Sequence, residues 1–392
     1  MTSKRTLFPK RTLFRLAVLA ACAVAALAIM ACGSDSSSES GSTSSADSTD
    51  STNKYQARLD ELYKGTQAEP TGDDFKPPSG KNVWVISTGQ NIETSLRATA
   101  AQEKAAEALG WEVKIFDGKF DSARELTGIQ QAIAAKADGI IMLYIDCAPV
   151  KSGLQQAKEA GIPVVAIEGM DCKPGLFSHK ILYAGDMEYT DWIQSWGASQ
   201  AAWVIAKTNG QAKTIINIET DLTVTALQEP GIRREFAKCP TCEIVGNASF
   251  VGADFGPPLQ EKISQQFIKN PDANSFIAAY DASLTSGGAQ ALKATGRLSE
   301  IKVMGGEGSV PGIKLIRSGK GMDACSGLDT GTEGWASMDS MGRLFANLDP
   351  SNTNSGIGFQ VCDKDHNLPP EGQAYTPPVD YVGAYLKKWG KQ

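Results

Sequence analysis

Histidine is nearly absent from this chain, which has only two, His179 and His366, among 392 residues. Histidine is the side chain that most often moves protons near neutral pH, so general acid–base catalysis has few candidates here. The sequence also lacks a nucleophile elbow, a phosphate loop and an HExxH metal motif. Glu219 and Asp221 stand two residues apart at the end of one predicted strand, whereas paired glycosidase acids flank a bond from two sides. We therefore expect neither an enzyme nor a bound metal or cofactor.

Clusters of basic residues are missing as well, apart from the first residues. The chain carries 38 Lys and Arg against 44 Asp and Glu. Five of the basic residues and no acids lie in residues 1–31, so the rest has 33 basic against 44 acidic residues, a net charge of −11. Binding to a phosphate backbone requires clustered cations. This composition argues against a nucleic acid as partner.

The first 52 residues follow the order of an export signal: a basic start, an apolar run over residues 16–29, and a hydrophilic tract over residues 34–52. The apolar run is too short to be interpreted first as a membrane span. The stretch ending at Cys32 resembles a bacterial lipobox, which implies cleavage before Cys32 and lipid on its thiol. Cys22 ends a similar stretch, but cleavage there would leave a further apolar segment. An uncleaved signal anchor is the other alternative, and the hydrophilic tract disfavours it. We predict an extracytoplasmic bacterial protein, lipid-anchored to the cell membrane.

Six cysteines remain beyond Cys32, an even number consistent with up to three disulfides in an oxidising exterior. Sequence alone leaves their connectivity open. Cys147 and Cys172 each follow a strand-like run, one helix apart, so the carboxyl ends of those strands would be neighbours in a parallel sheet.

Cys239 and Cys242 form a CxxC motif, for which a redox or zinc site is the alternative to a loop disulfide. A zinc site would need two more ligands, and a redox motif usually opens a helix, whereas this one follows a helix. We favour the loop disulfide. Cys325 and Cys362 are the remaining pair by elimination.

Short apolar runs alternate with amphipathic helical segments from residue 81 onward. This alternation predicts an α/β fold with right-handed parallel crossovers and helices on both faces of a sheet. It restarts near residue 181, so we predict two doubly wound lobes, with a ligand cleft at their junction beyond the carboxyl ends of the strands. The predicted strands are residues 82–87, 111–116, 138–146, 162–168, 181–184, 213–219, 243–248, 275–280 and 301–304. The predicted helices are residues 94–109, 126–135, 150–160, 190–206, 227–237, 258–268, 284–294 and 313–318.

Several stretches together resemble the ribose/galactose-type periplasmic binding proteins, the type I fold of solute-binding proteins that serve ABC importers. Each is a weak motif alone, but their order, their spacing and the lipoprotein leader strengthen the resemblance, which covers roughly residues 82–347. Segments 363–370 and 377–381 look like those of exported actinobacterial members. The similar stretches are residues 83–89, 137–143, 161–167, 279–296 and 301–308.

The resemblance implies two parallel-sheet lobes joined by a three-strand hinge. The chain would cross between lobes near residues 185–188, 326–330 and 357–361. A Cys325–Cys362 disulfide would then clamp two hinge strands. The implied lobes are residues 81–186 plus 329–356 and residues 187–328 plus 357–392. Residues 32–80 would be a disordered stalk and a pre-domain segment, with a short helix over residues 54–64 outside the core.

The family's pocket pattern is only partly met, because Glu168-Gly169 stands where many sugar binders have Asp-Arg. Acids at strand ends are the main candidates, since carboxylates hold hydroxyl pairs or ammonium groups tightly. The alternative for each acid is a helix cap. We expect Asp281→Ala to abolish stabilisation by ligand with the fold intact. The candidate ligand residues are Gln90, Asn91, Tyr144, Asp146, Glu168, Glu219, Asp221, Tyr280, Asp281 and Glu307.

These patterns predict a monomeric, lipid-anchored solute-binding component of an ABC importer. It would capture a small polar molecule, such as a sugar or polyol, and present it to a membrane permease. Two alternatives stay open. One is a ligand-sensing ectodomain of the same fold, and the other is an importer component whose ligand is a cationic amine.

Overall fold

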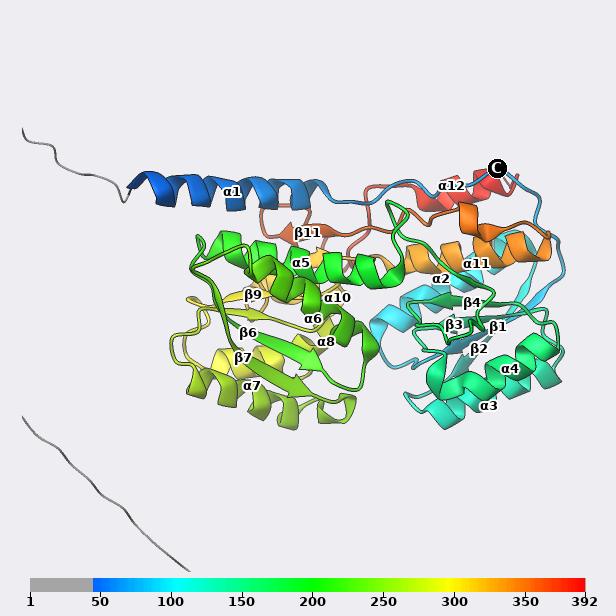
Figure 1. Ribbon diagram of the computed structural model, residues 1–392, viewed down its shortest axis with the longest axis horizontal. Helices are drawn as coiled ribbons and strands as arrows, with labels where there is room; N and C mark the ends of the chain where they lie inside the picture. Colours follow the sequence, from blue (N-terminus) through cyan, green and yellow to red (C-terminus); the bar gives the residue numbers. More distant parts are fainter. Residues whose placement is uncertain (1–44, 392) are drawn as a thin grey trace, which may run out of the picture. The chain divides into compact units, whose positions relative to one another are not determined.

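The computed structural model describes residues 45–391, with side chains from residue 54 onward. The predicted leader and the lipidation residue Cys32 lie outside this range. Within the described residues, no helix has both the length and the apolar character that crossing a bilayer requires. Two separate sheets, each flanked by helices, form the two lobes (Figure 1). This confirms the predicted α/β fold with two doubly wound lobes.

The first sheet has the strand order β2-β1-β3-β4-β5, and every neighbouring pair is parallel. Its three inner strands β1, β3 and β4 are short, apolar and mostly buried, as in the run Val83, Trp84, Val85 and Ile86 of β1. The strands are β1 (Asn82–Ser87), β2 (Glu112–Asp117), β3 (Gly139–Leu143), β4 (Val164–Ile167) and β5 (His179–Lys180).

Four helices and one short turn of helix cover this sheet. The alanine-rich α2 ends at Gly110, which has φ 71°, a left-handed conformation that glycine adopts without steric cost. α11 packs on α2 and β4 although it lies far along the chain, as the resemblance implied. These elements are α2 (Glu93–Leu109), α3 (Ser122–Ala134), η1 (Ala148–Val150), α4 (Lys151–Glu159) and α11 (Thr330–Phe345).

The second sheet has the order β11-β10-β9-β8-β6-β7 and is parallel except for β11. Helix α5 carries three tryptophans and packs on β8, β9 and β10. The strands are β6 (Lys213–Glu219), β7 (Glu243–Phe250), β8 (Ser275–Ile277), β9 (Lys302–Met304), β10 (Ala324–Gly327) and β11 (Gln360–Asp363). The helices are α5 (Tyr189–Lys207), α6 (Thr223–Phe236), η2 (Gly252–Asp254), α7 (Pro257–Lys269), α8 (Asp281–Ser283), η3 (Leu284–Gly288), α9 (Ala289–Ala294) and α10 (Val310–Ser318).

The segment before the first lobe is part of the folded body, so the prediction that residues 54–64 lie outside the core is wrong. Helix α1 (Ser45–Lys64) packs on α5 and β11. Its side chains Leu59 and Leu62 are buried, and the hydroxyl of Tyr63 donates to Asp363. Leucines at positions 59 and 62 lie one turn apart and make an apolar stripe. The helix is thereby fixed to the second lobe (Figure 1).

The residues that follow α1 run back along the hinge to the first lobe. Backbone N–H groups of Thr66, Ala68 and Thr71 donate to the carbonyls of Phe359, Gly356 and Asn354, at 3.0 Å each. The indole N–H of Trp111 then donates to the carbonyl of Pro78. We call residues 66–80 the N-terminal strap. The strap therefore connects the lobes in addition to the three expected crossings. This corrects the expectation that residues 66–80 form a segment that precedes the folded domain.

The end of the chain also differs from the expected boundary. Helix α12 (Tyr381–Lys388) packs on α11 of the first lobe, not on the second lobe. The indole of Trp389 donates to Asp339 of α11 at 2.8 Å, and Phe75 of the strap donates to the Lys388 carbonyl at 2.8 Å. A further short helix, η4 (Pro350–Asn352), precedes the last crossing. The rest of the proposed lobe division stays a prediction.

The structure brings the cysteines together in the favoured pairs. The sulfur atoms of Cys147 and Cys172 lie 1.98 Å apart, and those of Cys239 and Cys242 lie 2.12 Å apart. Cys325 and Cys362 face each other on β10 and β11, with sulfur atoms 1.97 Å apart. The last pair therefore joins the strands that enter and leave the hinge.

Candidate functional site

The lobes meet at the carboxyl ends of their strands, a surface we call the interlobe face. The hydroxyl of Thr223, at the start of α6, donates to the Asp146 carboxylate, which follows β3. The backbone N–H of Val310 on α10 donates to Glu93 on α2 at 2.9 Å. Since parallel strands point their carboxyl ends to one edge, both sheets present their following loops to this face. Asp146 therefore lies where the sequence predicted ligand contacts.

Two carboxyl groups of the first lobe come together behind this face. Glu168 follows β4 and is half-buried, and Glu333, in the first turns of α11, is 0% exposed. The hydroxyl of Tyr144, which follows β3, donates to Glu333 Oε2 at 2.6 Å. Glu168 and Tyr144 both have left-handed backbones, with φ 47° and 62°. Non-glycine residues hold such conformations at a cost, and such residues cluster at functional sites.

The two acids influence each other's protonation. Burial raises the pKa of Glu168 to about 7. Burial, together with the adjacent charge of Glu168, raises the pKa of Glu333 well above its usual value. Two carboxyl groups this close do not both ionise readily, so the pair retains a proton near neutral pH. We call Glu168 and Glu333 the acid pair.

Aromatic side chains surround the acid pair. Tyr183 lies at the first lobe crossing and Tyr189 opens α5; both are buried, and burial followed by the charges of the pair raises their pKa values. Tyr183 stacks on Trp192 of α5 with ring centroids 4.1 Å apart. The Tyr183 hydroxyl and Glu333 Oε1 have no hydrogen-bond partner within residues 54–391. The site thus holds unsatisfied polar atoms next to an apolar wall.

The second lobe places a smaller acidic group at the same face. The hydroxyl of Tyr280 donates to Glu219, which ends β6 and whose pKa burial raises to about 7. Asp221 is exposed and accepts from the backbone N–H of Gly252 at 3.2 Å. Phe255 contacts Tyr280 edge-on, with centroids 6.4 Å apart. These residues form the second-lobe side of the candidate site.

Two other candidates are occupied inside the second lobe. Asp281 is 1% exposed, and its oxygens accept from the backbone N–H groups of Gly306, Gly308 and Ser309 and from the Ser309 hydroxyl. Glu307 is buried and accepts from the Asp281 N–H at 3.1 Å. These contacts fit the loop-anchoring alternative, since every Asp281 oxygen is saturated by its own lobe.

Three candidate residues lie in loops of the first lobe, and they too differ in whether their polar atoms are already paired. The side-chain amide of Gln90 donates to Ser87 at 2.8 Å and accepts from Thr99 at 3.1 Å, so its polar atoms are paired within the lobe. Asn91 is exposed. Asp146 accepts from the Met170 N–H at 2.8 Å as well as from Thr223. Of these three residues, Asp146 is the one that accepts a hydrogen bond from the other lobe.

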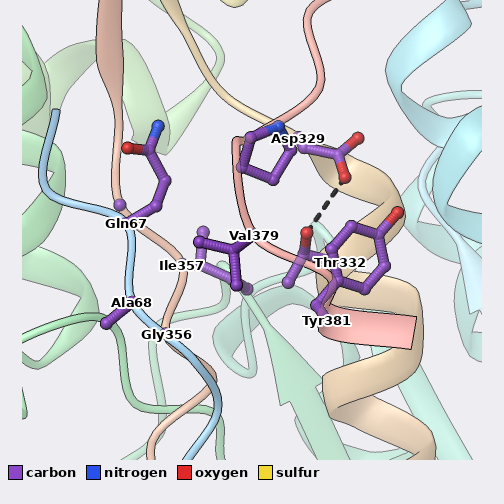
Figure 2. Close-up of a pocket in the computed structure, with 10 residues that line it drawn as sticks. Gln67, Ala68, Asp329, Thr332, Gly356, Ile357, Val379 and Tyr381 are labelled. Atoms are coloured by element: carbon purple, nitrogen blue, oxygen red, sulfur yellow. Dashed lines mark hydrogen bonds between the residues drawn. The ribbon is translucent and has the colours of Figure 1, made fainter. Parts of the chain in front are cut away.

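Two open recesses lie at the hinge. One recess of about 250 Å³ lies between the N-terminal strap, residues 356–358, the start of α11 and residues 377–381. Figure 2 shows it, with the Thr332 hydroxyl donating to Asp329 at 2.9 Å. A second recess of about 200 Å³ includes His179 and Tyr385. In the described part of the chain, no group of three or more His, Cys, Asp or Glu residues could hold a metal ion.

Sequence reasoning missed Glu333, Tyr183 and Tyr189. One signal was available for Glu333: the run Asp329-Thr330-Gly331-Thr332-Glu333 follows directly on a predicted lobe crossing. Asp329 caps α11 by accepting from the Gly331 N–H at 3.2 Å. A helix that starts at a crossing points its first turns at the junction of the lobes. For the tyrosines, no sequence pattern distinguishes this role from ordinary packing.

Comparisons with known proteins agree with this geometry. A family model described as "Periplasmic binding protein domain" matches residues 83–348. The chain is 25% identical over 238 residues to the ribose import binding protein RbsB of Salmonella typhimurium, covering 60% of this chain and 75% of that protein. It is 21% identical over 224 residues to the galactofuranose-binding protein YtfQ of Escherichia coli, covering 56% and 67%.

Solved structures share the fold. A periplasmic solute-binding protein from Actinobacillus succinogenes with bound D-allose has a TM-score of 0.62 at 17% identity, covering 73% of this chain and 98% of that one. The solute-binding protein of Thermotoga lettingae with 5-methylthioribose has a TM-score of 0.62 at 16% identity, covering 81% and 100%. At these identities the likeness establishes the two-lobed fold.

Proposed function

The chain belongs to the periplasmic binding protein domain family, and on this premise we propose that it is the extracytoplasmic solute-binding component of an ABC importer. In this role it captures a small hydroxylated solute between its two lobes and presents it to a membrane permease. The observation that carries the proposal is that both lobes present acids and tyrosines to one interlobe face.

The relatives support a sugar-like ligand. By their names or titles, the similar proteins bind or import ribose, galactofuranose, D-allose and 5-methylthioribose. All four molecules present several hydroxyl groups, which donate to carboxylates and accept from tyrosine hydroxyls. The candidate residues of both lobes supply these groups.

Ligand binding would work by closing the lobes. A ligand shifts the population toward a closed form only by contacts that the open form lacks. Tyr144 and Glu168 lie on one lobe and Glu219 and Tyr280 on the other, so a ligand between them gains contacts only when both lobes approach. No bond in the ligand is broken, and we propose no catalytic step.

The finer parts of the assignment are proposals with support from the sequence. Residues 1–31 are a signal peptide, and Cys32 carries the lipid that holds the protein at the outer face of the cell membrane. The three cysteine pairs are disulfides, consistent with the oxidising exterior. The protein acts as a monomer. The candidate ligand residues named above stay predictions.

Thermal unfolding of the chain lacking residues 1–32 tests the proposal, because this form keeps α1 and the strap. The panel contains pentoses, hexoses and polyols. A ligand that binds only the folded state raises the unfolding midpoint by mass action, and at 100 times its Kd it adds about 2.7 kcal/mol. A midpoint that rises with concentration for at least one sugar is the expected result. No shift for any sugar or polyol at millimolar concentration would contradict the proposal.

A further inference from the structure

The acid pair has no basic partner. Among the ion pairs of residues 54–391, none joins a Lys or Arg to Glu168 or Glu333. Two other deeply buried acids do have one: Asp339 pairs with Arg343 at 2.8 Å and Asp329 pairs with Arg97. Asp281 and Glu307 also lack a basic partner, but backbone N–H groups donate to their carboxylates. Buried carboxylates are normally paired or hydrogen-bonded, because removing them from water is costly. Within residues 54–391 the acid pair has neither a basic partner nor a backbone donor, and this combination is the unusual feature of the site.

Two buried polar atoms at the pair point to something that the chain does not supply. Glu333 and Tyr183 are 0% exposed; within residues 54–391 the Tyr183 hydroxyl has no hydrogen-bond partner, and Glu333 Oε1 has none beyond the proton that the pair retains. Most buried polar groups in folded proteins have a partner. Glu168 and Tyr144 are half-buried, so the pair is reached from solvent on one side.

The surrounding rings favour a cation over an anion. Tyr144, Tyr183 and Tyr189 lie close enough to the pair for its charges to raise their pKa values, after burial itself. Aromatic faces attract cations and repel anions. Of the further charges near the pair, Asp146 is acidic, and the charge of Asp329 is balanced by Arg97.

From these observations we propose that the solute carries a protonated amine, which lies between the carboxyl groups of Glu168 and Glu333 and against the tyrosine rings. The preferred ligand class is then an amino sugar rather than a neutral sugar. The proposal deepens the proposed function and rests on it. The hydroxyl groups of the solute contact Glu219 and Tyr280 of the other lobe.

Calorimetric titration of the chain lacking residues 1–32 tests the amine with matched sugars. The probes are glucosamine, galactosamine and mannosamine, each compared with its neutral parent and with its N-acetyl derivative. A charged amine on an unpaired acid makes charge-assisted hydrogen bonds, so we expect binding about 10-fold to 100-fold tighter than the parent sugar. N-acetylation removes the charge and returns the affinity to that of the parent or below.

Variants assign the preference to the pair. Glu333→Gln and Glu168→Gln keep the side-chain shape, and each lowers the affinity for the amine at least about 10-fold. The matched control is Asp323→Asn. Asp323 is another half-buried acid with a raised pKa due to burial, but it lies at the opposite, amino end of β10. Far-UV circular dichroism checks that each variant folds. If Glu333→Gln does not fold, the affinities of Glu168→Gln decide the test.

The outcomes separate the two proposals. Equal binding of amine and parent sugar, or tight binding of a neutral sugar alone, overturns the amine and leaves the sugar-binding function standing. Preference for the amine that both glutamine variants retain also overturns the inference, since the amine then binds elsewhere. Failure of every amino sugar and every neutral sugar to bind overturns both proposals.

Discussion

The two lobes bury acids in similar places but use them differently. In the second lobe, the oxygens of Asp281 accept from three backbone N–H groups and a hydroxyl of the loop that follows β9. In the first lobe, Glu333 accepts one hydrogen bond from Tyr144 and keeps Oε1 without a partner. Both residues are almost fully buried. A buried acid whose oxygens already accept several hydrogen bonds thus holds the loops of its own lobe in place. A buried acid with an oxygen that lacks a donor is available to a ligand.

This difference teaches that burial and a raised pKa do not identify a ligand contact by themselves. Burial raises the pKa of Glu307 to about 8, followed by the charge of Asp281, and burial raises that of Glu168 to about 7. Glu307 and Glu168 differ instead in the hydrogen bonds that they already accept within their own lobes. Glu307 accepts from the backbone N–H of Asp281. Three experiments sharpen or break the comparison.

The largest expected effect is that of Asp281→Ala on stability. The change leaves three buried backbone N–H groups without an acceptor, at about 1–3 kcal/mol each, so we expect a loss of at least about 3 kcal/mol in the free energy of unfolding. Urea unfolding measures it. The control Asp221→Ala, at an exposed acid, should lose less than about 1 kcal/mol. Unchanged stability with lost ligand response would restore the original prediction that Asp281 contacts the ligand.

An intermediate effect is expected from pH. The pKa of Glu168 is about 7 in the folded protein, above the ordinary value of 4.5, so between these values the folded state holds a proton that the unfolded state has lost. The contribution of Glu168 to the free energy of unfolding therefore falls as pH rises from about 4.5 to about 7, by about 1–3 kcal/mol. Glu307 extends the fall to about pH 8.

Glutamine variants separate the two contributions to this fall. Urea unfolding across the pH range measures the free energy of unfolding of each variant. Glu168→Gln should remove the part of its decline that ends near pH 7, and Glu307→Gln should remove the part that ends near pH 8. If Glu168→Gln shows the same pH dependence of stability as the wild-type chain, the acid pair does not carry the proton inferred here.

The smallest expected effect is that of a single hydroxyl. Tyr144→Phe removes the donor to Glu333 at 2.6 Å and should cost about 1 kcal/mol, or about 5-fold in ligand affinity. Tyr280→Phe is the matched variant on the other lobe, where it frees Glu219. Titration of both variants with the best ligand shows whether the two lobes contribute alike. A loss confined to Tyr280→Phe would shift the candidate site to the second lobe.

Periodicity and composition were enough to predict the two-lobed fold, because buried parallel strands such as β1 are continuous apolar runs and glycines such as Gly110 end their helices. They were not enough for α1, whose two buried leucines, Leu59 and Leu62, sit in an otherwise polar segment. The roles of Asp281 and Glu333 could not be separated either. Both are acids near the ends of elements, and only the three-dimensional arrangement shows how many donors each one meets.

The N-terminal strap and helix α12 meet beside the first lobe, whereas helix α1 lies on the second lobe. The backbone N–H of Phe75 donates to the Lys388 carbonyl at 2.8 Å, and the Lys388 ammonium donates to the Gly72 carbonyl at 2.6 Å. Fluorescent reporters placed at α1 and at α12 would therefore ride on different lobes and report lobe movement. Labels at Glu93 and Val310, whose contact joins the lobes at their rim, would change separation most. A biosensor built from this protein should carry its dye pair there.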